Sequence, residues 1–142
     1  MSFFPNGLHP EPNMVDQGFW EHCRHQRLMF QSCGSCGVLR HPPTPFCASC
    51  HSTEVAWREA PKVGKVYTYT IAHHATDSSV DGATPYIIAL VEFDDFGPVR
   101  LVTNILASVE EITIGLPVSL FWDRVADDMF LPLFKPVGKS GS

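Results

Sequence analysis

Two C-x-x-C motifs constrain this chain more than any other feature. The first contains Cys33 and Cys36, and the second, ten residues further on, contains Cys47 and Cys50. Each motif turns two sulfurs toward one point, and zinc in structural sites prefers a closed tetrahedral shell of four sulfurs. The spacing therefore predicts one structural Zn²⁺ ion held by these four cysteines.

The segment between the two motifs indicates which kind of zinc module to expect. Residues 38–46 contain three prolines, which suit an extended connection and argue against a helix. Gly34 and Gly37 allow the backbone to turn tightly beneath the metal, where a Cβ would be strained. We therefore expect a zinc ribbon built from strands rather than a zinc finger with a helix.

Other roles for these side chains agree less well with the sequence. The cysteines would form two disulfides in an oxidising compartment, but residues 1–7 have neither the basic segment nor the apolar run of a signal peptide. We therefore expect a cytoplasmic protein. His41 and His51 lie close enough to replace a cysteine ligand. Because four thiolates already complete the shell, we expect both to be surface histidines.

Charge restricts the partners that this chain can have. Its 142 residues carry a net charge of −5, with four basic and five acidic residues before Pro61 and six basic and ten acidic residues from there on. Proteins that bind nucleic acid neutralise phosphates with Lys and Arg, and this chain has few of them. It also lacks the run of about 18 to 20 apolar residues that a membrane span requires. We expect neither a nucleic acid nor a membrane as partner.

The N-terminal part predicts an irregular arm followed by one helix. Residues 1–15 contain prolines, a glycine and asparagines, and Asp16 can then cap a helix over residues 17–27. Phe19, Trp20 and Cys23 fall on one stripe of that helix; the simplest interpretation is that they pack against the ribbon, and binding of a partner by Phe19 and Trp20 is the alternative. His22, Cys23 and His25 resemble a nucleophile with its base. However, no carboxylate is expected to orient His25, so we interpret Cys23 as a small buried hydrophobe.

The remainder of the chain predicts a small β-barrel. After a linker over residues 57–61, turn residues separate five strand-like segments, at residues 64–74, 86–94, 99–106, 117–125 and 130–135. The second segment is almost continuously apolar and is expected to be buried on both faces, with residues 94–98 forming a hairpin turn after it. Five short strands match the OB-fold, although a small β-sandwich remains an alternative.

The order of these pieces resembles a known family. Phe19-Trp20, the two cysteine motifs, Gly64-Lys65-Val66, Tyr86-Ile87-Ile88 and Leu131-Pro132-Leu133 are similar to the acyl-CoA-associated family with a rubredoxin-like zinc ribbon and an OB-fold. The resemblance covers about residues 17–137, and His51 departs from it where glycine is usual. Together with the patterns above, it predicts a mainly β chain with an irregular arm at 1–15, a helix and ribbon at 16–60, an OB-fold at 61–137 and a flexible tail at 138–142.

The resemblance also implies a function. Members of that family are small non-catalytic subunits of thiolase, steroid side-chain aldolase or acyltransferase complexes, which places this chain in lipid or aromatic degradation. A thiolase-like partner would supply the reactive cysteine, and the zinc-containing subunit would help to form or cover the site of an acyl-CoA thioester. The implied assembly is a hetero-oligomer.

Two other functions are alternatives to that of a thiolase-associated subunit. Zinc ribbons and OB-folds also occur in nucleic-acid-binding proteins, although the acidic charge opposes that role here. A free-standing, hydrolase-like enzyme would use His73 and His74, which end the first long strand, with Asp77 and Asp81 in the loop that follows. The same loop composition is typical of any solvated loop.

Large apolar side chains indicate where a partner would bind. The chain is 44% hydrophobic and only 18% charged, and a small barrel cannot enclose all the aromatic residues of its arm, helix, ribbon and C-terminal segment. We expect some of them to remain exposed and to anchor an interface, with Phe19 and Trp20 as the candidates. The set is Phe3, Phe4, Phe19, Trp20, Phe46, Phe121, Trp122, Phe130 and Phe134.

Overall fold

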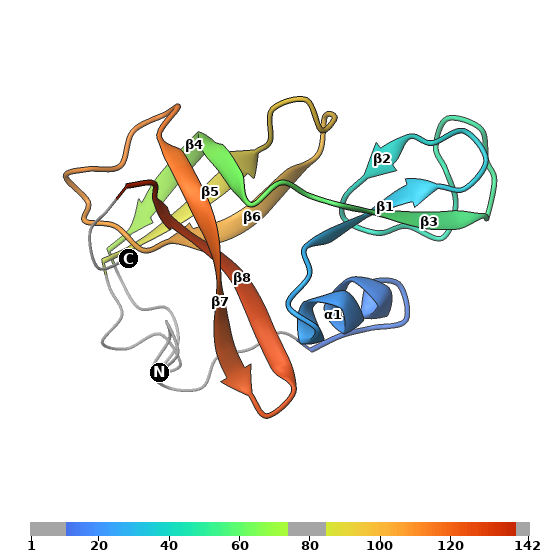
Figure 1. Ribbon diagram of the computed structural model, residues 1–142, viewed down its shortest axis with the longest axis horizontal. Coiled ribbons are helices and arrows are strands. Elements are labelled where there is room, and N and C mark those ends of the chain that lie inside the picture. The colour runs from blue at the N-terminus through green and yellow to red at the C-terminus, as the bar shows by residue number, and fades with distance from the viewer. Residues whose placement is uncertain (1–10, 74–84, 139–142) are drawn as a thin grey trace.

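The computed structural model describes residues 11–73 and 85–138. It places a short helix, α1 (Gln17–Arg24), beneath a three-stranded ribbon sheet and beside a β-barrel (Figure 1). The ribbon sheet has the order β2-β1-β3 and consists of β1 (Met29–Cys33), β2 (Leu39–Arg40) and β3 (Val55–Glu59). These elements confirm a ribbon without a helix between the cysteine motifs.

The barrel contains the five strands expected of an OB-fold. Its closed order is β4-β5-β6-β8-β7, in which β6 and β8 are parallel and the other neighbours are antiparallel. The fold class is therefore confirmed as mainly β with one N-terminal helix. The strands are β4 (Val63–Ala72), β5 (Tyr86–Glu92), β6 (Arg100–Ile105), β7 (Pro117–Ala126) and β8 (Met129–Pro136).

Helix α1 is shorter than predicted and is capped differently. It ends at Arg24, because Gln26 adopts a left-handed conformation with φ of 57° that an α-helix cannot continue through. Asp16 occupies the cap position, but its side chain makes no capping hydrogen bond. Its carboxylate instead accepts a hydrogen bond from the amide of Asn13 at 2.8 Å, so the side chain orders the segment before the helix.

Two further predictions about strands are wrong. Residues 57–61 were expected to be a linker, but Trp57 pairs with Gln31 and Arg58 pairs with Phe30 in strand β3. Most of β3 is exposed, so it lacks the apolar pattern that marks a strand. In β5, Ile87, Ala89 and Val91 are buried, whereas the residues between them are only half-buried. The strand therefore alternates instead of being buried on both faces.

Ribbon and barrel share one hydrophobic core. Phe30 of β1 is fully buried, and its ring lies 5.8 Å from that of Phe93 and 5.7 Å from that of Phe96, next to the β5–β6 turn. The same turn approaches the ribbon at Gly97, where a Cβ would lie 2.8 Å from the side chain of Leu39. The β5–β6 hairpin thus fixes the position of the ribbon on the barrel.

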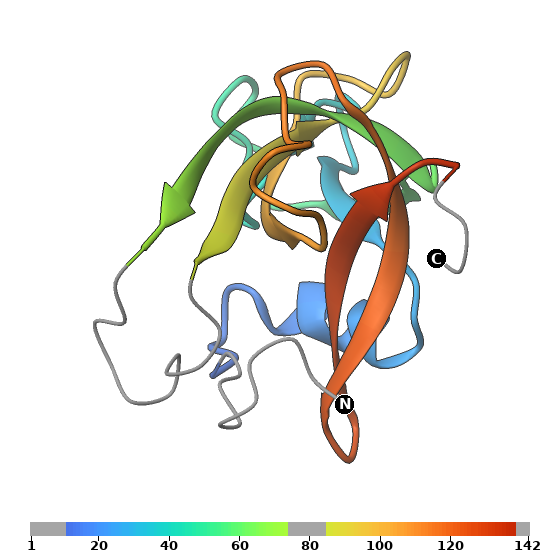
Figure 2. The same cartoon turned by 90° about the vertical axis from the view of Figure 1, so that its left-hand side faces the viewer.

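Helix α1 contacts both the ribbon and the barrel. It contacts β8 of the barrel and β1 of the ribbon, and Figure 2 shows it beside the β7–β8 hairpin. Phe19 and Cys23 are its buried residues. The ring of Phe19 lies 6.4 Å from that of Phe30, so the helix contributes directly to the shared core.

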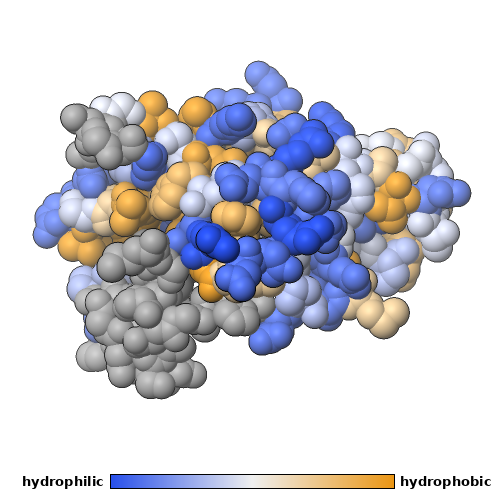
Figure 3. All heavy atoms as spheres, turned by 60° about the horizontal axis from the view of Figure 1, so that its bottom comes forward, coloured by the Kyte–Doolittle hydropathy of each residue, from blue (hydrophilic) through white to orange (hydrophobic). Residues whose placement is uncertain are grey.

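Some aromatic residues remain exposed, as predicted, but Phe19 is not among them. Phe19 and Phe134 are 4% and 0% exposed, so Phe19 is a core residue and not an exposed anchor. Phe46 is 52% exposed, and Phe3 and Phe4 lie outside the described residues. Figure 3 shows hydrophobic residues in separate groups toward both ends of one face, with strongly hydrophilic residues between them. Trp20, Phe121, Trp122 and Phe130 are half-buried.

Among the described helical residues, none belongs to a helix long and apolar enough to cross a membrane.

Candidate metal centre

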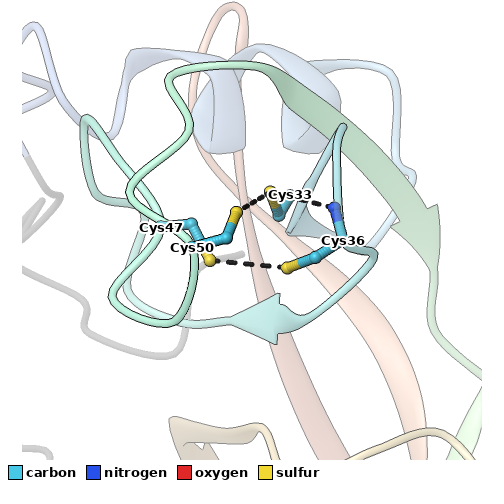
Figure 4. A group of neighbouring side chains, drawn as sticks. All are labelled: Cys33, Cys36, Cys47 and Cys50. Atoms are coloured by element: carbon cyan, nitrogen blue, oxygen red, sulfur yellow. Dashed lines mark hydrogen bonds between the residues drawn. The ribbon is translucent and has the colours of Figure 1, made fainter.

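The fold brings the four cysteine sulfurs of the two C-x-x-C motifs to one point. Their Sγ atoms all lie within 4.8 Å of one another, and Figure 4 shows them facing a common centre. Cys33 and Cys50 are 3.5 Å apart and Cys36 and Cys47 are 3.7 Å apart, sulfur to sulfur. A tetrahedron with Zn–S bonds of about 2.3 Å has edges of about 3.8 Å. The arrangement therefore fits a zinc ion, and the distances are too long for disulfide bonds.

The two motifs adopt the same backbone conformation. Gly37 donates its amide to the carbonyl of Cys33 at 2.9 Å, and His51 donates its amide to the carbonyl of Cys47 at 2.8 Å. Both donors have left-handed backbones, with φ of 81° at Gly37 and 66° at His51. Glycine adopts this conformation without strain, whereas histidine does not. His51 thus occupies the position that Gly37 occupies in the first motif.

Backbone amides prepare the sulfurs to bind a cation. The amides of Cys36 and Ser35 donate to the sulfur of Cys33, each at 3.3 Å, and lower the pKa of that thiol to about 6. The amides of Cys50 and Ser49 lower the pKa of Cys47 in the same way. These hydrogen bonds favour the thiolate form, which is the form that binds zinc.

The sulfur of Cys50 shows why the site needs a cation. The amide of Ser52 lowers the pKa of Cys50, but the neighbouring sulfurs, first that of Cys33, outweigh it and raise the pKa to about 12. Thiolates so close together repel one another, and a divalent cation removes that penalty. Four thiolates would leave zinc without an open position, so the site would stabilise the ribbon and perform no chemistry.

A glutamine that the sequence did not single out holds the connection between the two motifs. Gln31 of β1 is 5% exposed, and its Oε1 accepts hydrogen bonds from the Arg40 guanidinium and, at 2.9 Å, from the amide of Thr44. The side chain therefore fixes the proline-rich connection to the central strand. A single glutamine in a short strand carries no sequence signal for this role.

His41 is not the surface histidine that was expected. Its ring lies 5.0 Å from the ring of Phe19 and 5.0 Å from that of Phe30. Burial lowers the pKa of His41 to about 4, so the side chain is neutral near pH 7. It is an aromatic packing residue at the junction of helix and ribbon. His51, by contrast, is exposed.

The other candidate residues lie apart from the cysteine site. Cys23 is 1% exposed, and burial raises its pKa to about 12, as suits a packing residue. The prediction that no carboxylate faces His25 is wrong, because Glu21 Oε2 lies 3.2 Å from its Nε2, one helical turn away. His73 is exposed just after β4, and His74, Asp77 and Asp81 lie outside the described residues.

Two family models match consecutive parts of the chain. One describes the rubredoxin-like zinc ribbon domain of ChsH2 and matches residues 20–56, and the other describes its C-terminal OB-fold domain and matches residues 57–123. A DUF35 domain-containing scaffold protein of Pyrococcus furiosus is 31% identical over 110 residues, which are 77% of this chain and 79% of that protein. The chain belongs to the ChsH2 (DUF35) family.

Two further proteins are similar to this chain over different shares of their length. A probable enoyl-CoA hydratase alpha subunit of Thermomonospora curvata is 39% identical over 135 residues, which are 93% of this chain and 41% of that protein. This chain therefore spans less than half of that relative. A DUF35 domain-containing scaffold protein of Methanocaldococcus jannaschii is 29% identical over 77% of each chain.

Solved structures agree with the family assignment. A chain of the Ltp2–ChsH2(DUF35) aldolase is 37% identical, superimposes with a TM-score of 0.81 and covers 90% of this chain and 98% of its own length. A DUF35 protein of Sulfolobus solfataricus is 18% identical with a TM-score of 0.60, covering 87% of this chain and 86% of its own, and supports the fold alone.

Proposed function

We propose that this chain is a non-catalytic, zinc-containing subunit that binds a thiolase-like acyl-CoA enzyme. The observation that carries the proposal is the likeness to nearly the whole of a chain from the Ltp2–ChsH2(DUF35) aldolase. One Zn²⁺ ion held by Cys33, Cys36, Cys47 and Cys50 would stabilise the ribbon. The partner would provide the reacting groups, and the OB-fold would help to cover the acyl-CoA site.

Exposed apolar residues on the ribbon and on the segment before α1 support a partner there. Met14, Val15, Pro45 and Val55 line one hollow, and Phe46 follows Pro45 directly; we call these five residues the ribbon patch. Met14 is 93% exposed and Phe46 is 52% exposed. Apolar and aromatic side chains gathered on a surface commonly mark a protein interface.

The chemistry of two relatives favours aldol cleavage among the reactions of thiolase-like enzymes. One relative is named an aldolase complex and another a probable enoyl-CoA hydratase subunit. Hydration of an enoyl thioester produces a 3-hydroxyacyl thioester, which is the substrate that a retro-aldol cleavage requires. We therefore propose that the partner of this chain cleaves a 3-hydroxyacyl thioester.

Co-expression tests the proposal. The chain is produced with the thiolase-like enzyme encoded nearest to its gene, and the two are expected to elute together in a fixed ratio and to bury at least roughly 1,000 Å². Turnover by the enzyme should depend on the presence of the chain. Separate elution, together with unchanged stability and turnover of the enzyme when the chain is added, would contradict the proposal.

A further inference from the structure

The barrel closes at the seam between β6 and β8 through a short stretch of backbone pairing. These two parallel strands pair at one position, Ile105 with Phe134. Beside this pair, the amide of Leu106 donates a hydrogen bond to the carbonyl of Phe134 at 2.8 Å. Two residues earlier in β8, the Thr103 hydroxyl donates to the carbonyl of Pro132 at 2.8 Å. A side chain thus makes the contact that a backbone amide makes elsewhere in a sheet.

Pro132 gives a reason why this backbone pairing is short. In a strand, the amide and carbonyl of one residue point to the same side, so the nitrogen of Pro132 faces β6 as its carbonyl does. Proline has no amide hydrogen and cannot donate to the neighbouring strand. The seam therefore lacks a backbone hydrogen bond at this position and is held by Thr103 instead.

A cavity of about 230 Å³ borders this seam. Strands β6 and β8 form one side of it, α1 forms another, and the loop at His41 completes it. The lining is mainly apolar and aromatic, with a few polar groups, which is typical of small-molecule sites. Its principal members are Phe19 and Trp20 from α1, Thr103 and Asn104 from β6, and Leu131 and Leu133 from β8.

The volume of the cavity restricts what can enter it. An engineered apolar cavity of roughly 150 Å³ binds benzene, which has six carbon atoms. In proportion, the cavity of about 230 Å³ between α1 and the seam has room for about six to nine carbon atoms. This space accommodates a short acyl chain or a single apolar ring.

Charge restricts the ligand further. Asp16 lines the cavity, and no Lys or Arg is among the described residues that line it. His41 is neutral, as its burial between Phe19 and Phe30 requires. A free fatty acid would bring its carboxylate toward Asp16 without any cation to compensate, which is unfavourable. A thioester presents the same chain next to a neutral carbonyl.

We propose that this cavity binds the apolar chain of an acyl thioester, a role that rests on the proposed function because the thioester shared with the partner would supply the chain. The polar edge of the cavity also suits a neutral carbonyl. Asn104 donates through Nδ2 to the carbonyl of Ile87 at 2.8 Å, and this amide nitrogen carries a second hydrogen.

Calorimetric titration of the full chain tests the ligand class. The probes are acetyl-CoA, hexanoyl-CoA and free hexanoate. Each buried methylene group raises affinity about fourfold, so hexanoyl-CoA should bind at least about tenfold more tightly than acetyl-CoA. Hexanoate, which has the same chain with a charged end, should bind more weakly than hexanoyl-CoA.

Two substitutions of Leu131 test whether the acyl chain binds in the cavity. Leu131→Trp fills the space and should abolish the dependence of affinity on chain length, whereas Leu131→Ala enlarges it and should shift the preference toward octanoyl-CoA. Val63→Trp is the matched control, because Val63 is 51% exposed on β4 and does not line the cavity. It should behave like the unsubstituted chain, and zinc content reports folding of every variant.

The outcomes separate this proposal from the proposed function. Equal affinity for acetyl-CoA and hexanoyl-CoA, or an unchanged chain-length dependence in Leu131→Trp, would overturn the acyl-chain site even if the complex with the enzyme forms normally. If chain length has no effect and Leu131→Trp prevents complex formation, a side chain of the partner occupies the cavity and the proposal is wrong.

Discussion

Each cysteine motif is followed by a residue with a left-handed backbone, which is a glycine after the first motif and a histidine after the second. Gly37 tolerates φ of 81°, whereas His51 adopts 66° at a cost. A Cβ at Gly37 would meet nothing within 4 Å, so the cost of a substitution there is conformational and not steric. The second motif is therefore the more strained of the two.

Substituting Gly37 and substituting His51 should change the stability of the protein in opposite directions. Gly37→Ala is expected to lower the free energy of unfolding by about 1 to 2 kcal/mol, because alanine is strained at positive φ. His51→Gly should raise it by less than about 1 kcal/mol, because glycine also gains freedom in the unfolded chain. Denaturant titration of the zinc-loaded proteins measures both, and a stabilising Gly37→Ala would contradict the prediction.

Removing one sulfur should unfold the ribbon. Cys33→Ser and Cys47→Ser each remove one thiolate from the four-sulfur shell, and structural zinc sites contribute about 10 kcal/mol or more to folding. We expect both variants to lose the single equivalent of zinc, measured by elemental analysis. Cys23→Ala is the control: Cys23 is buried in the core, so this variant should keep its zinc and lose only packing energy.

His41 should make stability depend on pH. Its pKa falls from 6.5 to about 4 on folding, so the unfolded chain binds a proton more readily than the folded one. Stability from this group is complete above pH 6.5 and is lost as the pH falls toward 4, by about 2 to 3 kcal/mol. His41→Phe keeps an aromatic ring in the cluster and should remove this slope. Denaturation at pH 7 and pH 5 compares the two proteins, and zinc release at low pH affects both alike.

At the scale of elements, α1 contributes to the core through Phe19. Phe19 reaches the core from the helix, and its ring lies 5.0 Å from those of Trp20 and His41. The helix also forms one side of the cavity at the seam between β6 and β8. A residue that was expected to bind a partner thus holds helix, ribbon and barrel together.

Truncating Phe19 should therefore destabilise the free chain. Phe19→Ala removes a buried ring and is expected to cost about 3 to 5 kcal/mol. Phe46→Ala removes a ring that is 52% exposed and should change stability by less than about 0.5 kcal/mol. Thermal unfolding of the two variants tests the contrast. Equal melting temperatures would mean that Phe19 contributes little to the core.

At the scale of the whole molecule, the ribbon patch is the surface that we expect to meet the enzyme. Phe46→Ala should weaken the complex at least about tenfold, because aromatic anchors carry much of the energy of an interface. Ile114→Ala is the matched control, since Ile114 is 69% exposed but lies outside the ribbon patch. Biosensor titration of the two variants against the enzyme measures the difference. A similar loss in both variants would place the interface elsewhere.

The sequence determined the parts of this protein that depend on local chemistry. Cysteine spacing predicted the ribbon, because two C-x-x-C motifs can turn four sulfurs toward one point without knowledge of the rest of the fold. Turn residues predicted five barrel strands with small errors at their ends, because glycine, proline and aspartate act on the backbone where they stand. Strand β3 was missed because an exposed strand has no apolar pattern.

Only the tertiary structure decided which apolar side chains are buried and where the backbone pairing of the barrel is short. No local sequence pattern predicts that Phe19 and His41 are largely buried and that Phe46 is exposed. Burial depends on contacts with segments that are distant along the chain. The seam between β6 and β8 depends on Pro132 facing β6 and not β7, which no local pattern specifies. Contacts between distant segments thus formed the cavity, whereas local chemistry formed the zinc ribbon.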